Sequence, residues 1–103
     1  MTTEQKVQYI ADHYGYEAQS RQLIEEMAEL IVAINKLWRK HEFNSTSIGL
    51  AKAHYNILEE MADTLIMIWQ IQYLLGVGDG ELSEIVELKL DRQIKRIRGG
   101  NDA

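Results

Sequence analysis

The chain has 103 residues, a length that favours a single domain. It contains no cysteine, which excludes a disulfide framework, a thiol nucleophile and a zinc–thiolate site. A hydrophobic content of 46% argues against disorder. The formal net charge of −5 argues against affinity for nucleic-acid polymers.

Four helical segments are predicted, and because the chain has no proline, glycines and polar clusters must mark their boundaries. The first covers about residues 3–13 and stops at Gly15, so that residues 1–16 form an N-terminal helix and turn. The second covers about residues 17–42, where apolar residues recur every three or four positions, at Leu23, Met27, Leu30, Ile34 and Leu37. A polar loop over residues 44–49 is expected to follow.

The third segment is expected to start near Leu50 and to end at Gly76. It is apolar almost all round from Leu65 onward, so we expect it to be largely buried. A glycine-rich turn separates it from a fourth segment, which Asp79 or Ser83 would cap. The fourth segment extends to about residue 98, with acids early and bases late as the helix dipole favours, and residues 99–103 should fray.

No stretch alternates between apolar and polar residues long enough to indicate a strand. We therefore predict one all-α domain over residues 1–103, built as an antiparallel helical bundle of about four helices. The first ten residues lack the apolar run of a signal peptide, and the longest apolar stretch is far shorter than the ~20 residues that span a bilayer. We expect a cytoplasmic protein without a membrane partner.

Two of the predicted helices carry the same acidic pattern. Residues 25–29 read Glu-Glu-Met-Ala-Glu, and residues 59–63 read Glu-Glu-Met-Ala-Asp. Residues three apart share a helix face, so Glu26 points with Glu29, and Glu60 points with Asp63. At about 100° per residue, these acids lie at or beside the apolar faces of their helices.

A pair of acids on a helix is usually a solvated face, but that interpretation fits poorly here. Burying an unpaired carboxylate costs several kcal/mol, and two such pairs on facing helices would repel each other. Neither motif contains a basic residue. A hard divalent cation with oxygen ligands, such as Mg²⁺, resolves the conflict. No Glu-x-x-His or His-Glu-x-x-His spacing supports a di-iron or zinc site.

A basic segment lies in the fourth predicted helix. Cations near its C-terminal end are explained by the helix dipole alone. Lys89 and Arg92 lie further in and share a face, so we expect their stems to pack while their charged groups reach toward the acidic cluster. Acids that hold a metal, with a lysine and an arginine nearby, form a site suited to a polyphosphate.

These motifs resemble those of the MazG-like all-α NTP pyrophosphatases. The resemblance rests on Glu25-Glu26-Met27-Ala28-Glu29 followed by Glu60-Met61-Ala62-Asp63, and it covers roughly residues 19–97. The downstream Lys89-Leu90-Asp91-Arg92 is similar to the basic, phosphate-contacting helix of the family. The interval between Glu29 and Glu60 is longer than in compact members, with the extra length near residues 43–53.

The resemblance implies hydrolysis of a nucleoside triphosphate between its α- and β-phosphates, giving a monophosphate and pyrophosphate, in the service of nucleotide-pool house-cleaning. It implies that Mg²⁺, with Mn²⁺ as a second option, is held by Glu26, Glu29, Glu60 and Asp63. The proton of the attacking water would be accepted by Glu25 or by a weakly bound ligand such as Glu29.

The resemblance also assigns substrate contacts and an oligomeric state. Lys89 and Arg92 would offset charge on the phosphates. Gln22, on the face of Glu26, and Gln19 would contact base or sugar, with ordinary helix surface as an equally good interpretation. Homodimers or homotetramers are implied, with helices of two subunits completing the bundle. Two interpretations compete with this one: a phosphoribosyl-ATP pyrophosphohydrolase of the same superfamily, and a non-catalytic helical module that binds a nucleotide or a partner.

Overall fold

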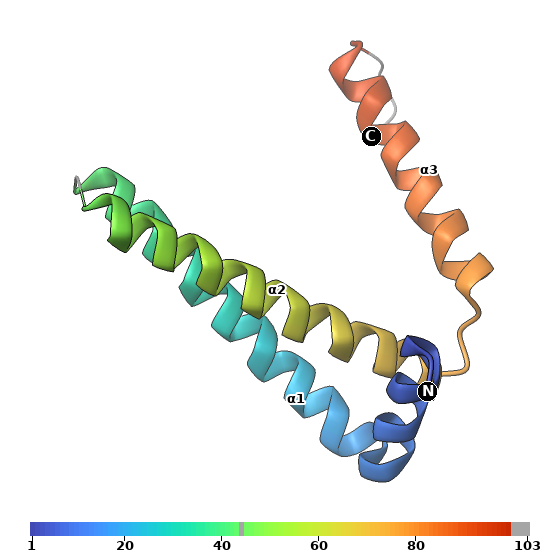
Figure 1. The fold of residues 1–103 in the computed structure, drawn as a ribbon. Helices are drawn as coiled ribbons and strands as arrows, with labels where there is room; N and C mark the ends of the chain where they lie inside the picture. The colour runs from blue at the N-terminus through green and yellow to red at the C-terminus, as the bar shows by residue number, and fades with distance from the viewer. Residues whose placement is uncertain (44, 100–103) are drawn as a thin grey trace.

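The computed structural model describes residues 1–43 and 45–99, which form three helices and no strand. Helix α1 spans Thr3–Glu42, α2 spans Ser47–Leu74 and α3 spans Asp79–Ile97 (Figure 1). The predicted all-α class is confirmed. Asn44, at the start of the predicted loop, and residues 100–103 of the predicted frayed tail lie outside the described residues.

Helix α1 is broken at Gly15. It begins with a capping box, in which the Gln5 N–H donates to the Thr2 hydroxyl at 3.1 Å and the Thr2 N–H donates to the Gln5 side chain at 2.9 Å. Gly15 has φ 84° and ψ 169°, a combination that is almost exclusive to glycine. The predicted stop at Gly15 is therefore confirmed. It separates an N-terminal arm (residues 3–14) from the long half of α1 (residues 16–42).

The N-terminal arm folds back over the end of α2 (Figure 1). The Tyr73 hydroxyl lies 2.9 Å from both carboxylate oxygens of Asp12 and joins the arm to α2. This hydrogen bond, followed by desolvation, raises the pKa of Tyr73, as expected for a phenol that donates to a carboxylate. The arm is thus attached by a side-chain contact across the chain as well as by the turn at Gly15.

Helices α1 and α2 lie antiparallel, joined by a short connection (Figure 1). The Thr46 hydroxyl accepts from the Gly49 N–H at 3.1 Å and caps α2, so the helix begins at Ser47. The predicted start near Leu50 and the predicted loop over residues 44–49 are therefore wrong by about one turn. A single threonine cap was enough to bring Gly49 into the helix.

The turn after α2 uses Gly76 in a left-handed conformation, with φ 70°. The Val77 N–H donates to the Gln72 carbonyl at 3.1 Å and satisfies the helix end. At the start of α3, the Gly78 N–H donates to the Glu81 carboxylate at 2.9 Å. The prediction of an Asp79 or Ser83 cap is wrong, because Gly78 is the cap position and Glu81 supplies the capping carboxylate.

Within the described part of the chain, only α1 and α2 pack against each other, and α3 projects away from them (Figure 1). Every described α3 side chain is exposed except Arg92, which is half-buried. One copy of the chain is therefore a helical hairpin with an N-terminal arm and a projecting third helix. It does not form a four-helix bundle by itself.

The core of one chain is narrow. Its buried side chains are Val7, Ala11, Gln19, Ala33, Ala53, Thr64, Met67 and Gln70. The expectation that α2 is largely buried beyond Leu65 is wrong for a single chain, because Leu65 is 45% exposed and Ile68 is 40% exposed. Helix α1 covers only one face of α2, and the other apolar faces have no neighbour among the described residues.

Across residues 1–43 and 45–99, none of the helices has both the length and the apolar character needed to cross a membrane.

Candidate metal centre

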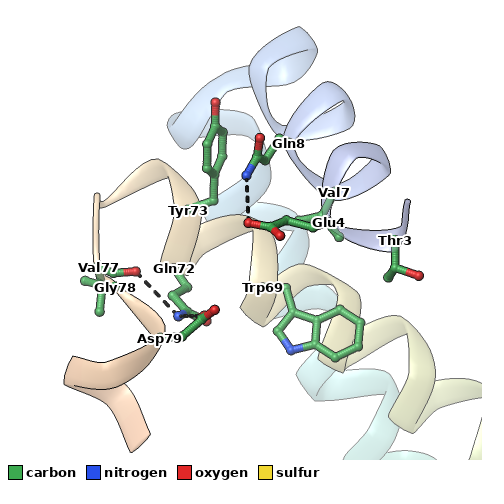
Figure 2. Close-up of a pocket in the computed structure, with 10 residues that line it drawn as sticks. All are labelled: Thr3, Glu4, Val7, Gln8, Trp69, Gln72, Tyr73, Val77, Gly78 and Asp79. Carbon is green, nitrogen blue, oxygen red and sulfur yellow. Dashed lines mark hydrogen bonds between the residues drawn. The ribbon is translucent and has the colours of Figure 1, made fainter. Parts of the chain in front are cut away.

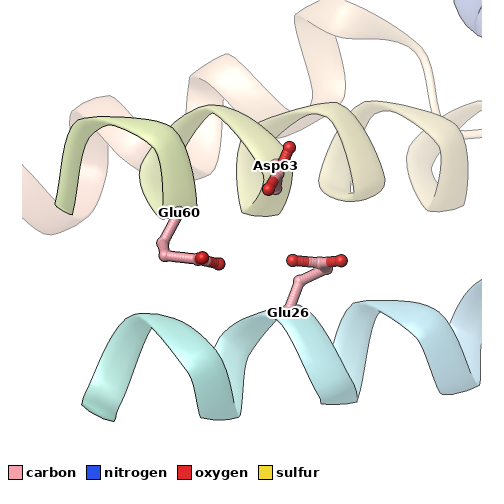
Figure 3. A group of neighbouring side chains, drawn as sticks. All are labelled: Glu26, Glu60 and Asp63. Atoms are coloured by element: carbon pink, nitrogen blue, oxygen red, sulfur yellow. The ribbon is translucent and has the colours of Figure 1, made fainter. Parts of the chain in front are cut away.

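Three carboxylates meet between α1 and α2. Glu26 projects from the long half of α1, and Glu60 and Asp63 project from α2 toward it (Figure 3). One oxygen from each residue lies within 4.8 Å of the others. The spacing of three between Glu60 and Asp63 places both on one helix face, and the antiparallel pairing of the helices sets that face against Glu26.

Two oxygens of this centre are buried without a hydrogen-bond partner. Glu26 Oε1 accepts from Gln22 Nε2 at 2.9 Å. Glu26 Oε2 and Glu60 Oε2 are buried and have no partner. A buried acceptor left unsatisfied costs about 1–3 kcal/mol, and more when it is charged. Because both orphaned oxygens belong to the same cluster, they fit a bound cation better than they fit a structural role.

Glu29, the fourth predicted ligand, is exposed, lies near Glu26 and Glu60, and is not one of the three converging acids. Repulsion by Glu26 raises its pKa above the ordinary 4.5, and desolvation and Glu60 add to the effect. All of these influences act in the same direction, so no cationic group offsets them. A divalent cation held between the carboxylates would supply the missing positive charge.

The donor set is made of carboxylate oxygens only, and it contains no histidine or thiolate. Hard cations such as Mg²⁺ and Mn²⁺ prefer oxygen ligands. Glu26 and Glu60 are half-buried whereas Asp63 is exposed, so the cluster is open on its Asp63 side.

The two predicted glutamines differ in their surroundings. Gln22 is half-buried and shares the face of Glu26, to which its Nε2 donates at 2.9 Å; its predicted contact with base or sugar stays a prediction. Gln19 is only 7% exposed, and its Nε2 donates to Oε1 of Gln70 at 2.7 Å. The interpretation of Gln19 as helix surface is wrong. Gln70 was not predicted at all, because a polar residue inside an apolar stretch gives no sign of a partner 51 positions away.

Glu25, the other candidate proton acceptor, is exposed and is not one of the three converging acids. Lys89 is exposed and Arg92 is half-buried, both on α3. The expectation that their charged groups reach the acidic cluster is wrong within one chain, because α3 packs on neither α1 nor α2. The turn through Gly76 and Gly78 leads α3 away, and within residues 1–43 and 45–99 α3 packs on no other helix (Figure 1).

A separate cavity of about 440 Å³ lies between the N-terminal arm, the end of α2 and the start of α3 (Figure 2). Val7 and Trp69 lie in its wall, and Glu4 and Asp79 add acidic groups at different sides of it. Gln72 Nε2 donates to Asp79 at 2.8 Å across this joint. None of the predicted site residues lines the cavity, so it is distinct from the carboxylate cluster.

Comparison of the chain with protein-family models, with curated proteins and with solved structures gives no match.

Proposed function

We propose that the protein is a Mg²⁺-dependent nucleoside triphosphate pyrophosphohydrolase of the MazG-like type, which converts an NTP or dNTP to its monophosphate and pyrophosphate. The observation that carries this proposal is the convergence of Glu26, Glu60 and Asp63, with two buried oxygens that have no partner. The converging residues are those of the two acidic motifs on which the family resemblance rests.

In this proposal Glu26, Glu60 and Asp63 hold the cation, with Mn²⁺ able to replace Mg²⁺. When bound, the metal neutralises phosphate charge and lowers the pKa of a water molecule. Gln22 holds one Glu26 oxygen through its 2.9 Å hydrogen bond, which leaves the other oxygen for the cation. Gln19 receives no substrate contact, because its amide is buried and bonded to Gln70.

Glu29 is the proposed acceptor of the proton from the attacking water. It neighbours Glu26 and Glu60 but does not belong to the group of three, so it is free to take a proton. Because Glu29 shares a helix face with Glu26 and Glu25 does not, we favour Glu29 of the two candidates.

The proposal includes a homodimer or homotetramer. Large apolar side chains are exposed on both α1 and α2, including Trp38 at 62% and Trp69 at 38%. On helix α3, Ile85 and Val86 are exposed, and no other helix in the described part of the chain packs against them. A second copy would cover both surfaces. In such an assembly, attraction between opposite charges would favour an arrangement with Lys89 and Arg92 of one copy beside phosphates held at the carboxylates of the other copy.

The test is pyrophosphate release from a panel of NTPs, dNTPs and phosphoribosyl-ATP in the presence of Mg²⁺. We expect release from at least one nucleoside triphosphate. Glu60→Gln should lower the rate by at least about a hundredfold, because it removes a ligand charge from the metal centre. Glu59→Gln is the matched control, since Glu59 is the exposed neighbour of Glu60 and lies outside the cluster. It should keep the wild-type rate.

Other outcomes separate the competing functions. Cleavage of phosphoribosyl-ATP alone would assign the protein to that narrower activity. Nucleotide binding by isothermal titration, with no Mg²⁺ enhancement and no product, would favour the non-catalytic module. Release of orthophosphate in place of pyrophosphate would overturn the proposed position of cleavage. No turnover of any substrate, or equal rates for Glu60→Gln and Glu59→Gln, would contradict the proposed enzyme.

A further inference from the structure

A buried pair of amides lies in the α1–α2 core, away from the carboxylates. Gln19 is 7% exposed and Gln70 is 2% exposed, and the bond between them is 2.7 Å long. Buried amides usually cost stability unless they are hydrogen-bonded, and an apolar pair of the same size would bury more hydrophobic surface. The pair therefore needs an explanation other than stability alone.

Its position along the helices gives that explanation. Gln19 precedes Glu26 by seven residues, and Gln70 follows Asp63 by seven residues. In an antiparallel helix pair, a step forward along one helix lies level with an equal step backward along the other. Two residue pairs that differ by such equal steps therefore belong to the same register. Bonding Gln19 to Gln70 therefore also sets Glu26 against Asp63. The Thr64 hydroxyl, which donates to the Glu26 carbonyl at 3.4 Å, is a second polar link in this register.

The hydrophobic contacts alone leave the register ambiguous. The seam side chains that are buried or half-buried recur every three or four residues on both helices, at Gln19, Gln22, Leu23, Glu26, Leu30, Ala33 and Leu37 in α1 and at Ala53, Asn56, Ile57, Glu60, Thr64, Met67, Gln70 and Ile71 in α2. A repeat of seven residues allows apolar rows to match again after a slide of one repeat. The connection between the helices would then have to move by only three or four residues.

Such a slide would destroy the carboxylate cluster. Seven residues correspond to about 10 Å along a helix. A slide in one direction would set Gln19 level with Asp63, and a slide in the other would set Glu26 level with Gln70. In both cases the two glutamines separate and Glu26 no longer faces Glu60 and Asp63. The register in which the amides bond each other is thus also the register in which the acids converge.

We propose that Gln19 and Gln70 are a positioning pair for the carboxylate centre, which fix the register of α1 against α2 so that Glu26 meets Glu60 and Asp63. Polar pairs inside helix seams have this role in coiled coils, where they specify register at a cost in stability. The metal-binding part of this inference rests on the proposed function, whereas the register part rests on the helices alone.

The test replaces both glutamines with nearly isosteric apolar residues, as Gln19→Met together with Gln70→Met. We expect the melting temperature to stay at or above that of the wild type, because no buried polar group is left unpaired. We expect the Kd for Mn²⁺, measured by isothermal titration calorimetry, to rise about tenfold or more, as when groups that orient metal ligands are removed. The Gln19→Leu, Gln70→Leu double variant repeats the test if the methionine variant does not fold.

A control separates register from simple loosening of the fold. Ala53 is buried in the same seam at 4% exposed and has no part in the amide pair. Ala53→Gly should lower the melting temperature, since glycine weakens a helix. Its Mn²⁺ affinity should nevertheless stay at the wild-type value. If Ala53→Gly loses affinity as the double variant does, the amide pair has no special role.

The register itself can be measured without a metal. The chain has no cysteine, so Lys36→Cys and Lys52→Cys, both exposed, can carry spin labels on α1 and α2. Dilution with unlabelled protein removes distances between copies. The wild-type background should give one distance in double electron–electron resonance, and the Gln19→Met, Gln70→Met background should give a second or broadened distance.

The outcomes distinguish this inference from the proposed function. If the wild type binds Mn²⁺ and the double variant binds it equally well, the positioning role is overturned and the metal centre stands. If the wild type binds no Mn²⁺, the proposed metal centre is overturned, and the spin-label distances alone test whether the amide pair sets the register. A single unchanged distance in the double variant then overturns the register role, and a second distance supports it.

Discussion

Glu29 shows the electrostatic repulsion between the clustered acids through its pKa. Its pKa is raised chiefly by Glu26 and also by desolvation and by Glu60. The folded chain therefore favours the protonated form of Glu29 more than the unfolded chain does. Well below pH 4.5 the carboxyl is protonated in both states and carries no penalty. As the pH rises above 4.5, the unfolded chain ionises before the folded chain does, so the folded state loses stability until the pH passes the raised pKa and the penalty is complete.

We predict that Glu29→Gln stabilises the metal-free protein in a pH-dependent way. In EDTA, the melting temperature of the variant minus that of the wild type should grow between pH 4.5 and pH 7.5, because only the wild type ionises. Saturating Mn²⁺ should reverse the difference, since the cation stabilises the carboxylates of the wild type. Thermal unfolding followed by circular dichroism measures both. A difference that stays constant with pH would contradict the proposed repulsion, and Glu59→Gln should show no such trend.

At the residue scale, the sequence predicted the acids well and the amides poorly. Glu26, Glu60 and Asp63 could be placed together because helix spacing alone puts them on faces that a hairpin brings into contact. Gln19 could not be placed in the same way. Its burial depends on Gln70, and the bond between them requires a register that no local pattern records.

Among the elements, the break at Gly15 decides the shape of α1. A Cβ at Gly15 would meet no atom within 4 Å, so space is not the constraint. The constraint is the backbone, since φ 84° with ψ 169° is strained for any residue with a side chain. The break lets the N-terminal arm turn back to α2, where Asp12 meets Tyr73.

We predict that Gly15→Ala destabilises the arm by about 1–3 kcal/mol, because alanine favours continuation of the helix over this backbone conformation. Amide hydrogen exchange over residues 3–14 should become faster, whereas exchange in the middle of α2 should not. Gly80→Ala is the matched control: Gly80 lies inside α3 with open space around it, so alanine should stabilise that helix by a few tenths to about 1 kcal/mol. Unchanged exchange in the arm of Gly15→Ala would contradict the role of Gly15.

The sequence predicted the helix ends at which a glycine takes a positive φ, and it missed the helix starts that depend on side-chain caps. Gly15 and Gly76 were both recognised as ends, and both adopt positive φ. The start of α2 was misplaced because Thr46 competes with several polar neighbours as a cap, and only the 3.1 Å bond from Gly49 identifies it. The cap of α3 was misplaced for a similar reason, since Glu81 reaches back to Gly78.

On the scale of the whole molecule, a large amount of apolar surface is exposed to solvent in one copy of the chain. Ile24, Val32 and Trp38 on α1 are each more than 60% exposed, and no residue of α3 is buried. Such surface is rare in a soluble monomer and marks an interaction site. The sequence shows the excess of apolar residues, but it gives no packing partner for α3, because within residues 1–43 and 45–99 only α1 and α2 pack against each other.

We predict that the protein in solution has a mass of two or four times the 11.9 kDa of one chain, measured by light scattering coupled to size exclusion. Val86→Glu should lower that mass, because it places a charge on the unpartnered apolar face of α3. Glu84→Gln is the matched control, because Glu84 lies two residues before Val86, on about the opposite side of the helix, and is already polar and exposed. A monomeric wild type at micromolar concentration would contradict the proposed assembly.

The proposed metal centre requires that Glu26, Glu60 and Asp63 share one divalent cation. Crystals grown with Mn²⁺ and measured at a wavelength that gives manganese an anomalous signal test it directly. We predict an anomalous peak between α1 and α2, about 2.1 Å from one carboxylate oxygen of each of the three residues. The same crystals of Glu60→Gln should lose most of that peak. An anomalous map with no peak between these three carboxylates in the wild type would overturn the proposed metal centre.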